Sequence, residues 1–269
     1  MRRFALILFT LSILIGMAAV LSYGDELTGL QIMQRVDNRD DGDDISQKID
    51  QQLIDRRGSV RRRHMIAFRK DYGKDKKQIS YFLKPANIRD TALLTYDYHG
   101  ATRDDDQWLY LPALKRVRRI SASDRGDYFM GTDFTFEDIK QTPELEDYIW
   151  TLTGSGMVDG HDCWKVQGAP RTDDLKNDLG YSRTVSFVRK DNDVVIRVDY
   201  QDRKGQELKH LQVTGLMQIQ GIWTATSIRM ENVQTGHKTI MTFSEQRYNQ
   251  GFPDRTFSER MLKRGYRGN

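Results

Sequence analysis

The sequence predicts a mainly β protein built on one curved antiparallel sheet of roughly 11 to 13 strands. Many short segments alternate apolar and polar residues, and turn residues separate them. The strands do not alternate with helices, so a parallel sheet is not expected. Because so long an antiparallel sheet must curl, close or split, we expect an incomplete, half-open barrel with short N- and C-terminal helices over its apolar concave face. A two-sheet sandwich fits the same periodicity almost as well.

The N-terminus predicts export from the cytoplasm. Arg2 and Arg3 precede residues 4–21, a run of 18 residues without charge, and small residues follow it. This order is typical of a secretory signal peptide. We therefore expect residues 1–24 to be a cleaved signal and residues 25–269 to form a single periplasmic domain. The run is almost long enough to span a bilayer, so an uncleaved inner-membrane anchor is the alternative.

The composition is that of a soluble globular protein, with 38% hydrophobic and 30% charged residues. The formal net charge is +4, and removal of Arg2 and Arg3 with the signal leaves 40 basic against 38 acidic residues, or +2. So small an excess does not indicate a nucleic-acid partner. The one cysteine, Cys163, excludes an intramolecular disulfide.

The mature chain is expected to begin with a helix over residues 25–36. Leu27, Leu30, Met33 and Val36 recur every three residues and form one narrow apolar stripe. A single stripe predicts a helix that lies against another element instead of one buried on all sides.

The apolar period changes from helical to two at residue 46, and the first strand is expected from residue 51. Gly58, Gly73 and Pro85 mark the turns between the first strands. The expected strands in this first half are residues 51–55, 60–72, 78–84, 92–98, 108–111 and 115–119.

The second half has the clearest alternation, over residues 194–200. Gly221 and Gly236 provide hairpin turns between the last three long strands. The expected strands here are residues 162–167, 194–200, 207–217, 222–234 and 238–246.

Three further segments of the second half are not clear strands. Residues 144–152 are ambiguous between helix and strand, and residues 171–180 are expected to be a polar loop. Residues 254–264 predict a short C-terminal helix, with Phe257, Met261 and Leu262 on its apolar side.

Residues 107–138 concentrate large apolar and aromatic side chains between turn residues. Such side chains suit the wall of an apolar cavity, but they could equally fill an ordinary core. The candidate cavity residues are Trp108, Tyr110, Phe129, Met130, Phe134 and Phe136.

The ordered motifs W-L-Y-L-P, K-R-V-R-R and Y-F-M-G-T-D-F-T-F-E-D in this stretch resemble the LolA-like outer-membrane lipoprotein-sorting family. The resemblance extends over most of the mature chain, to a branch of periplasmic proteins often encoded beside large inner-membrane exporters. It implies a half-open barrel that holds lipid acyl chains. Carriers of this fold use an arginine to hold a lid shut, and Arg116, Arg118 and Arg119 are the candidates for lid or headgroup contacts. The central motif departs from that of the true lipoprotein carriers, which leaves the cargo open.

Common catalytic motifs are absent from the sequence. G-x-S-x-G, H-E-x-x-H, the P-loop and the dinucleotide fingerprint do not occur. His161 and Cys163 lack the further ligands that a zinc site needs, and residues 104–106 lack the spacing of a calcium loop. We therefore expect neither an enzyme nor a bound metal or cofactor, although a hydrolase with paired carboxylates stays a third hypothesis.

The principal hypothesis is a periplasmic carrier of lipid or lipoprotein acyl chains that works with an inner-membrane exporter between the inner and outer membranes. The alternative is a non-transporting module, an envelope-stress sensor or exporter adaptor with the same fold. The arginine tracts at residues 56–63 and 115–119 suit transient contact with an anionic membrane surface. They equally suit the solvated charge that protects edge strands from pairing.

Overall fold

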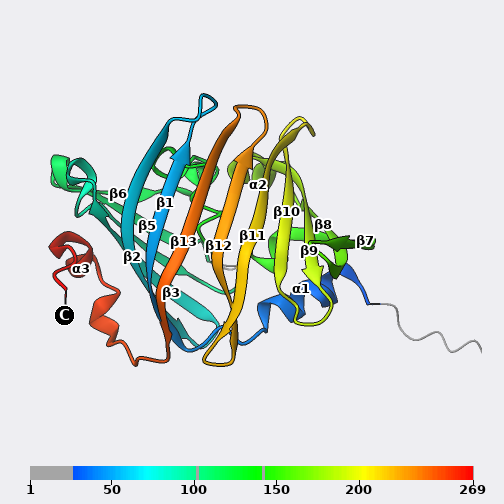
Figure 1. Cartoon of the computed structure of the whole chain (residues 1–269), viewed down its shortest axis with the longest axis horizontal. Coiled ribbons are helices and arrows are strands. Elements are labelled where there is room, and N and C mark those ends of the chain that lie inside the picture. The colour runs from blue at the N-terminus through cyan, green and yellow to red at the C-terminus, as the bar shows by residue number, and fades with distance from the viewer. Residues whose placement is uncertain (1–26, 101–102, 141–142, 269) are drawn as a thin grey trace, which may run out of the picture.

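A computed structural model describes residues 27–100, 103–140 and 143–268. Thirteen antiparallel strands form one curved sheet in the order β6-β5-β4-β3-β2-β1-β13-β12-β11-β10-β9-β8-β7 (Figure 1). The strands are β1 Asp44–Ile54, β2 Val60–Tyr72, β3 Asp75–Lys84, β4 Ala92–Asp97, β5 Asp106–Leu111, β6 Arg116–Ile120, β7 Tyr148–Val158, β8 His161–Pro170, β9 Tyr181–Arg189, β10 Val195–Asp202, β11 Glu207–Ile219, β12 Ile222–Asn232 and β13 His237–Tyr248. The half-open barrel predicted from the sequence is confirmed, and the sandwich is excluded.

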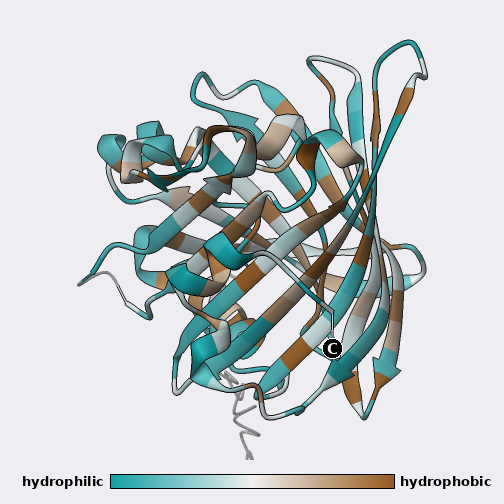
Figure 2. Ribbon diagram, turned by 90° about the vertical axis from the view of Figure 1, so that its left-hand side faces the viewer, coloured by the Kyte–Doolittle hydropathy of each residue, from teal (hydrophilic) through white to brown (hydrophobic). Residues whose placement is uncertain are grey.

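The strand order follows from one long-range pairing. β1 pairs with β2 on one side and with β13, the last strand, on the other. Two meanders therefore run outward from the β1–β13 pair, and β6 and β7 are the two edges of the open sheet. Residues 121–147 connect these edges, and we call them the crossover segment. Figure 2 shows the curvature of the sheet that this segment crosses.

Helix α1, Gly29–Asp37, begins with a capping box in which Thr28 and Gln31 bond reciprocally to backbone amides. Its buried Ile32 and Met33 pack against Val166 of β8 and neighbouring side chains. The predicted N-terminal helix is thus present over the described residues, and it lies on the concave side at the β7 end of the sheet.

Residues 171–180 are not the polar loop that we predicted, because helix α2 occupies Asp173–Leu179. The Thr172 side chain accepts from the Leu175 amide at 3.1 Å and caps the helix, and Gly180 ends it at a φ of 81°. Leu179 is fully buried, and this burial stabilises a helix too short to form alone.

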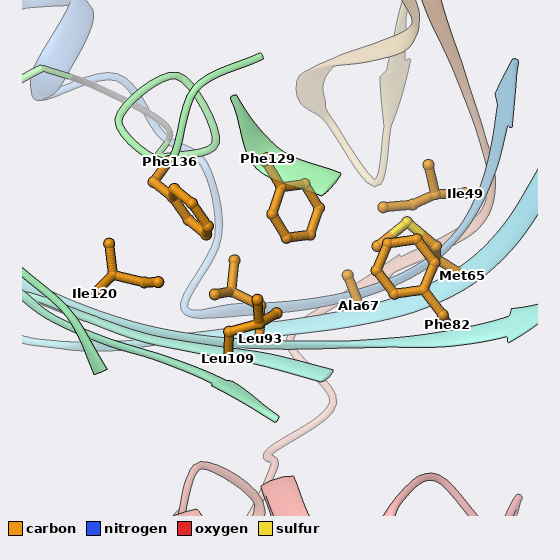
Figure 3. Packing of buried hydrophobic residues seen from close by; sticks show 9 residues of the cluster. All are labelled: Ile49, Met65, Ala67, Phe82, Leu93, Leu109, Ile120, Phe129 and Phe136. Carbon is orange, nitrogen blue, oxygen red and sulfur yellow. The ribbon is translucent and has the colours of Figure 1, made fainter. Parts of the chain in front are cut away.

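The C-terminal helix corrects a second prediction, because it covers the convex face of the sheet. Helix α3, Glu259–Arg264, and residues around it pack on Ile66, Ile79 and Tyr81. These side chains point away from the concave face, because neighbours along a strand point to opposite sides. Figure 3 shows the C-terminal segment across the strands from the concave cluster. The convex side of β2 to β5 is as apolar as the concave side and needs its own cover.

The concave face of β2 to β5 is filled by the crossover segment. Phe129 and Phe136 project from it onto the strands, with ring centroids 5.6 Å apart (Figure 3). The buried cluster consists of Ile49, Met65, Ala67, Phe82, Leu93, Leu109, Ile120, Phe129 and Phe136. The crossover segment therefore fills this half of the concave face, and we call it the plug.

The predicted signal, residues 1–24, lies outside the described residues. Within the described chain, each helix is too short or too polar to cross a bilayer.

Candidate functional site

Two neighbouring cavities lie on the concave face beside the plug. The larger has a volume of about 310 Å³ and the smaller about 210 Å³. Asp138, Lys140 and Leu211 line both, so the two share a wall. The apolar lining of the larger cavity consists of Ile45, Ile49, Ala67, Phe134, Ile139, Leu211, Ile228, Met241 and Phe243. A concave, mostly apolar lining of this size is typical of ligand sites.

The smaller cavity lies under α1, at the β7 end of the sheet. Met33 and Val36 of α1 form part of its wall, opposite Val198 and Tyr200 of β10. Trp150 of β7 completes the wall, and its ring nitrogen donates to the Leu145 carbonyl at 2.9 Å. The N-terminal helix thus covers a hollow part of the concave face.

The wall of the larger cavity also carries a charged group. Arg39 donates to the Trp223 carbonyl at 2.9 Å, which holds the start of β12. Arg69, only 3% exposed, donates to the carboxylate of Asp41 and to the Gly42 carbonyl. Burial raises the pKa of nearby Asp71 to about 6, although the positive charge of Arg69 opposes the shift. One part of the lining can therefore contact a polar headgroup while the rest is apolar.

Hydrogen bonds fasten the plug to strands β2 and β13. Arg63 of β2 donates to the Met130 carbonyl at 2.9 Å. The Asp133 amide donates to Thr239 of β13 at 3.0 Å, and the Asp133 carboxylate lies 2.7 Å from His237 Nδ1. These contacts come from strands far apart in the sequence, so the plug fixes the curvature of the sheet as well as its own position.

A buried lysine of β11 makes an ion pair with the plug. Lys209 is fully buried, and its Nζ lies 2.5 Å from Asp138 and 2.9 Å from the Asp133 carbonyl. Nζ also lies 5.3, 4.9 and 5.2 Å from the ring centres of Tyr128, Tyr181 and Tyr200. Burial lowers the pKa of Lys209, and the negative charge of Asp138 opposes this shift. The ion pair forms part of the wall between the two cavities, because Asp138 lines both.

A second buried lysine, Lys140, lies among carboxylates at the end of the plug. Its Nζ is 2.5 Å from Asp105, 3.1 Å from Glu137 and 3.8 Å from Asp97. Burial raises the pKa of Asp97 to about 7, although the positive charge of Lys140 opposes the shift. Glu144 has a pKa raised by the same cause. One cation therefore faces an excess of carboxylates here, and burial favours the protonated form of Asp97 and Glu144.

The structure divides the six predicted cavity residues between the two faces of the sheet. Trp108 and Tyr110 of β5 pack on the convex side with the C-terminal segment. On the concave side, Phe129 and Phe136 fill the buried cluster, and only Phe134 lines the larger cavity. Met130 packs against the edge of the same cluster. The central stretch thus supplies plug, core and cavity wall together.

The three predicted lid or headgroup arginines lie on edge strand β6, away from both cavities. Arg118 pairs with Asp124 at 2.9 Å, and Arg119 pairs with Asp106. Arg116 is exposed. The arginines beside the larger cavity are Arg39 and Arg69, which the sequence analysis did not single out.

Most of the cavity wall comes from strands that the sequence analysis read as ordinary hairpins. Ile49 of β1 and Phe243 of β13 are register partners, and so are Ile228 of β12 and Met241 of β13. The alternation of these strands was readable, but the long-range β1–β13 pairing that brings them together was not.

The described residues contain no group of three or more His, Cys, Asp or Glu side chains placed to hold a metal ion. Cys163 is fully buried and packs with Val158, Val194 and Ile196. His161 is exposed at the start of β8, directly after the turn at residues 159–160. This matches the predicted turn followed by a buried cysteine.

Comparison with known proteins places this fold in a family. A family model described as "Uncharacterized protein" matches residues 74–264. The crystal structure of a DUF1329 family protein from Desulfovibrio piger is 34% identical in sequence with a TM-score of 0.82, and the match covers 87% of this chain and 97% of that one. No curated protein matches the sequence significantly.

Two further solved structures have the same fold. A putative outer membrane lipoprotein-sorting protein domain from Vibrio parahaemolyticus is 31% identical with a TM-score of 0.80, covering 87% of this chain and 98% of that one. A LolA superfamily protein from Nitrosomonas europaea is 18% identical with a TM-score of 0.68, covering 88% and 100%, which shows a shared fold alone. The chain therefore belongs to the DUF1329 family, and its curved, open sheet has the LolA-like fold.

Proposed function

We propose that the chain is a periplasmic carrier that holds the acyl chains of a lipid or lipoprotein in the two concave cavities. The observation that carries this proposal is the pair of adjoining cavities, which have large apolar linings. Charged groups lie in their shared wall at Asp138 and Lys140, and at Arg39, Asp41 and Arg69 in the larger cavity. That arrangement suits an amphiphile with its chain inside and its headgroup at the charged part. The family relationship to a putative lipoprotein-sorting domain supports the same ligand class.

The energetics favour such a cavity over specific headgroup chemistry. Each buried methylene contributes about 0.8 kcal/mol, so about 14 methylenes contribute roughly 11 kcal/mol. Adaptable side chains such as Met241 and flat ones such as Phe134 and Phe243 suit an irregular chain. In this proposal residues 1–24 are a cleaved export signal, and residues 25–269 carry cargo between the inner and outer membranes with an inner-membrane exporter as partner.

The first test is native mass spectrometry of protein purified gently from the cell envelope, with organic extraction of anything bound. We expect a stoichiometric species with acyl chains. A clean apo mass that stays unchanged after incubation with lipids would contradict the carrier and favour a sensor or exporter adaptor.

A pair of matched variants locates the bound chain. Ile228→Trp places a large ring in the larger cavity, because Ile228 lines it beside Met241. Ile240 precedes Met241 on β13, so its side chain points to the opposite face of the sheet. Ile240→Trp therefore introduces the same ring outside the cavity. We expect the first variant to lose bound lipid and the second to keep it, with both proteins folded by circular dichroism. Equal lipid content in the two variants would place the ligand elsewhere.

A further inference from the structure

A third cavity lies on the convex face, between the C-terminal segment and strands β2 and β3. Its volume of about 490 Å³ exceeds that of either concave cavity. Phe68 and Tyr81 come from the sheet, and Phe252 and Tyr266 come from the C-terminal segment. The Phe68 ring lies 5.3 Å from that of Phe252 and 6.0 Å from that of Tyr266, between ring centres. We call this the C-terminal cavity.

The rim of the C-terminal cavity is strongly basic. Arg255, Arg260, Arg264 and Arg267 line it, and all four are exposed. Within the described chain, neither an aspartate nor a glutamate belongs to the lining, and none of these four guanidinium groups makes an ion pair.

Neighbouring carboxylates do not neutralise this rim. Asp254 is bound by Lys70 at 2.8 Å, and Lys70 also donates to the Phe252 carbonyl. Asp90 lies against Gly265 at one margin, and Glu259 adjoins Arg260 in α3, so these two carboxylates offset part of the rim. Positive charge therefore predominates around an aromatic floor.

We infer that the C-terminal cavity docks the protein on a membrane by taking an anionic phospholipid of the bilayer surface. Charge complementarity selects the anion, since guanidinium groups bind phosphate with bidentate geometry. The floor of four aromatic rings gives the glycerol and upper acyl region an apolar surface that a free phosphate would not use. Exposed arginines around an aromatic patch are the combination that binds anionic lipid surfaces. This docking does not depend on what the concave cavities hold.

The test is flotation of the full chain with vesicles of phosphatidylcholine alone or mixed with phosphatidylglycerol. We expect binding only to the mixed vesicles. Arg260→Glu with Arg264→Glu should weaken binding by at least about 30-fold, given the usual contribution of each basic residue near a charged membrane. The matched control, Arg56→Glu with Arg57→Glu, makes the same change in net charge in the turn between β1 and β2, at the far end of these strands (Figure 1). It should bind as the unchanged protein does.

Two further measurements distinguish docking in this cavity from other causes of vesicle binding. Tyr266→Ser removes part of the floor and no charge, and it should weaken vesicle binding several-fold with an unchanged circular dichroism spectrum. Inorganic phosphate should not release the protein from vesicles at constant ionic strength. The inference is overturned by absent vesicle binding, by equal losses in the two arginine pairs, by an unaffected Tyr266→Ser variant, or by release with phosphate. None of these outcomes bears on cargo in the concave cavities, which mass spectrometry measures.

Discussion

The two halves of the concave face use the same kind of strand and differ in what covers them. Over β2 to β5 the plug inserts Phe129 and Phe136, and the space is filled. Over β9 to β13 the crossover segment inserts only Phe134 of its phenylalanines, which packs with Tyr181 and Val198, and the two cavities are left beside it among the described residues. The crossover segment thus fills one half with two rings, and in the other half it leaves the space that we propose for a ligand. The sheet alone does not determine the site; the path of the chain across it does.

The largest expected effect on stability comes from removing a ring of the plug from the filled half of the concave face. Phe129 is 2% exposed, and Phe129→Ala should lower the free energy of unfolding by about 3–5 kcal/mol, the usual result for a buried phenylalanine. Phe243→Ala is the matched change at the larger cavity, where the partly exposed ring lines the space and packs only at the margin of the buried cluster. We expect it to cost about 1–2 kcal/mol, because a ring with fewer contacts loses less on truncation. Urea denaturation measures both.

The lipid that purifies with each of these two variants tests the same comparison between the halves. Phe243→Ala should change the amount or type of lipid that purifies with the protein, and Phe129→Ala should not. If Phe129→Ala alone altered the lipid, the plug would be a ligand wall and the distinction between the halves would be wrong.

The sequence predicted the positions of the strands far better than it predicted which face of each strand is concave. Alternation located β2 at residues 60–72, as the structure has it. The same alternation places Trp108 and Leu109 on opposite sides, but it does not say which side is concave, because both sides are apolar and both are covered. That choice depends on β1 pairing with β13, a contact between the two ends of the chain.

The sequence analysis missed helix α2 and the buried Lys209 for a different reason. The cap residues Thr172 and Gly180 of α2 are readable in the sequence, but seven helical residues with only two leucines form a weak periodic pattern. Lys209 was also passed over, since a lysine in a strand is usually solvated. Its burial depends on Asp138, which arrives from 71 residues away. Polar groups that pair over such distances have no signature in a single sequence.

The second-largest expected effect on stability comes from breaking the buried ion pair in the wall between the cavities. Lys209→Met keeps the volume but leaves Asp138 buried without its cation, and we expect a loss of about 3 kcal/mol in the free energy of unfolding. Lys238→Met is the matched control, since its pair with Glu231 is partly solvated and should contribute less than about 1 kcal/mol. Thermal unfolding at neutral pH distinguishes them. Similar losses in the two variants would mean that the buried pair does not hold the plug.

The smallest effect is a change in pH dependence at the end of the plug. The pKa of Asp97 is about 7 in the folded protein against 3.8 for an ordinary aspartate. Between these values the native state binds a proton that the unfolded state does not, so this group's contribution to stability is full below about pH 4 and is lost as the pH rises through 7. Asp97→Asn should therefore reduce the fall in stability between about pH 5 and about pH 8 by an amount on the order of 1 kcal/mol.

Denaturant midpoints at the two pH values measure this difference, with the exposed Asp104→Asn as control. Asp71, whose pKa is raised to about 6, should leave a residual slope of the same sign in the Asp97→Asn protein. An unchanged slope in Asp97→Asn would mean that Lys140 keeps Asp97 ionised across this range. The end of the plug would then be held by charge at every pH, and the boundary between the filled and hollow halves would not respond to acid.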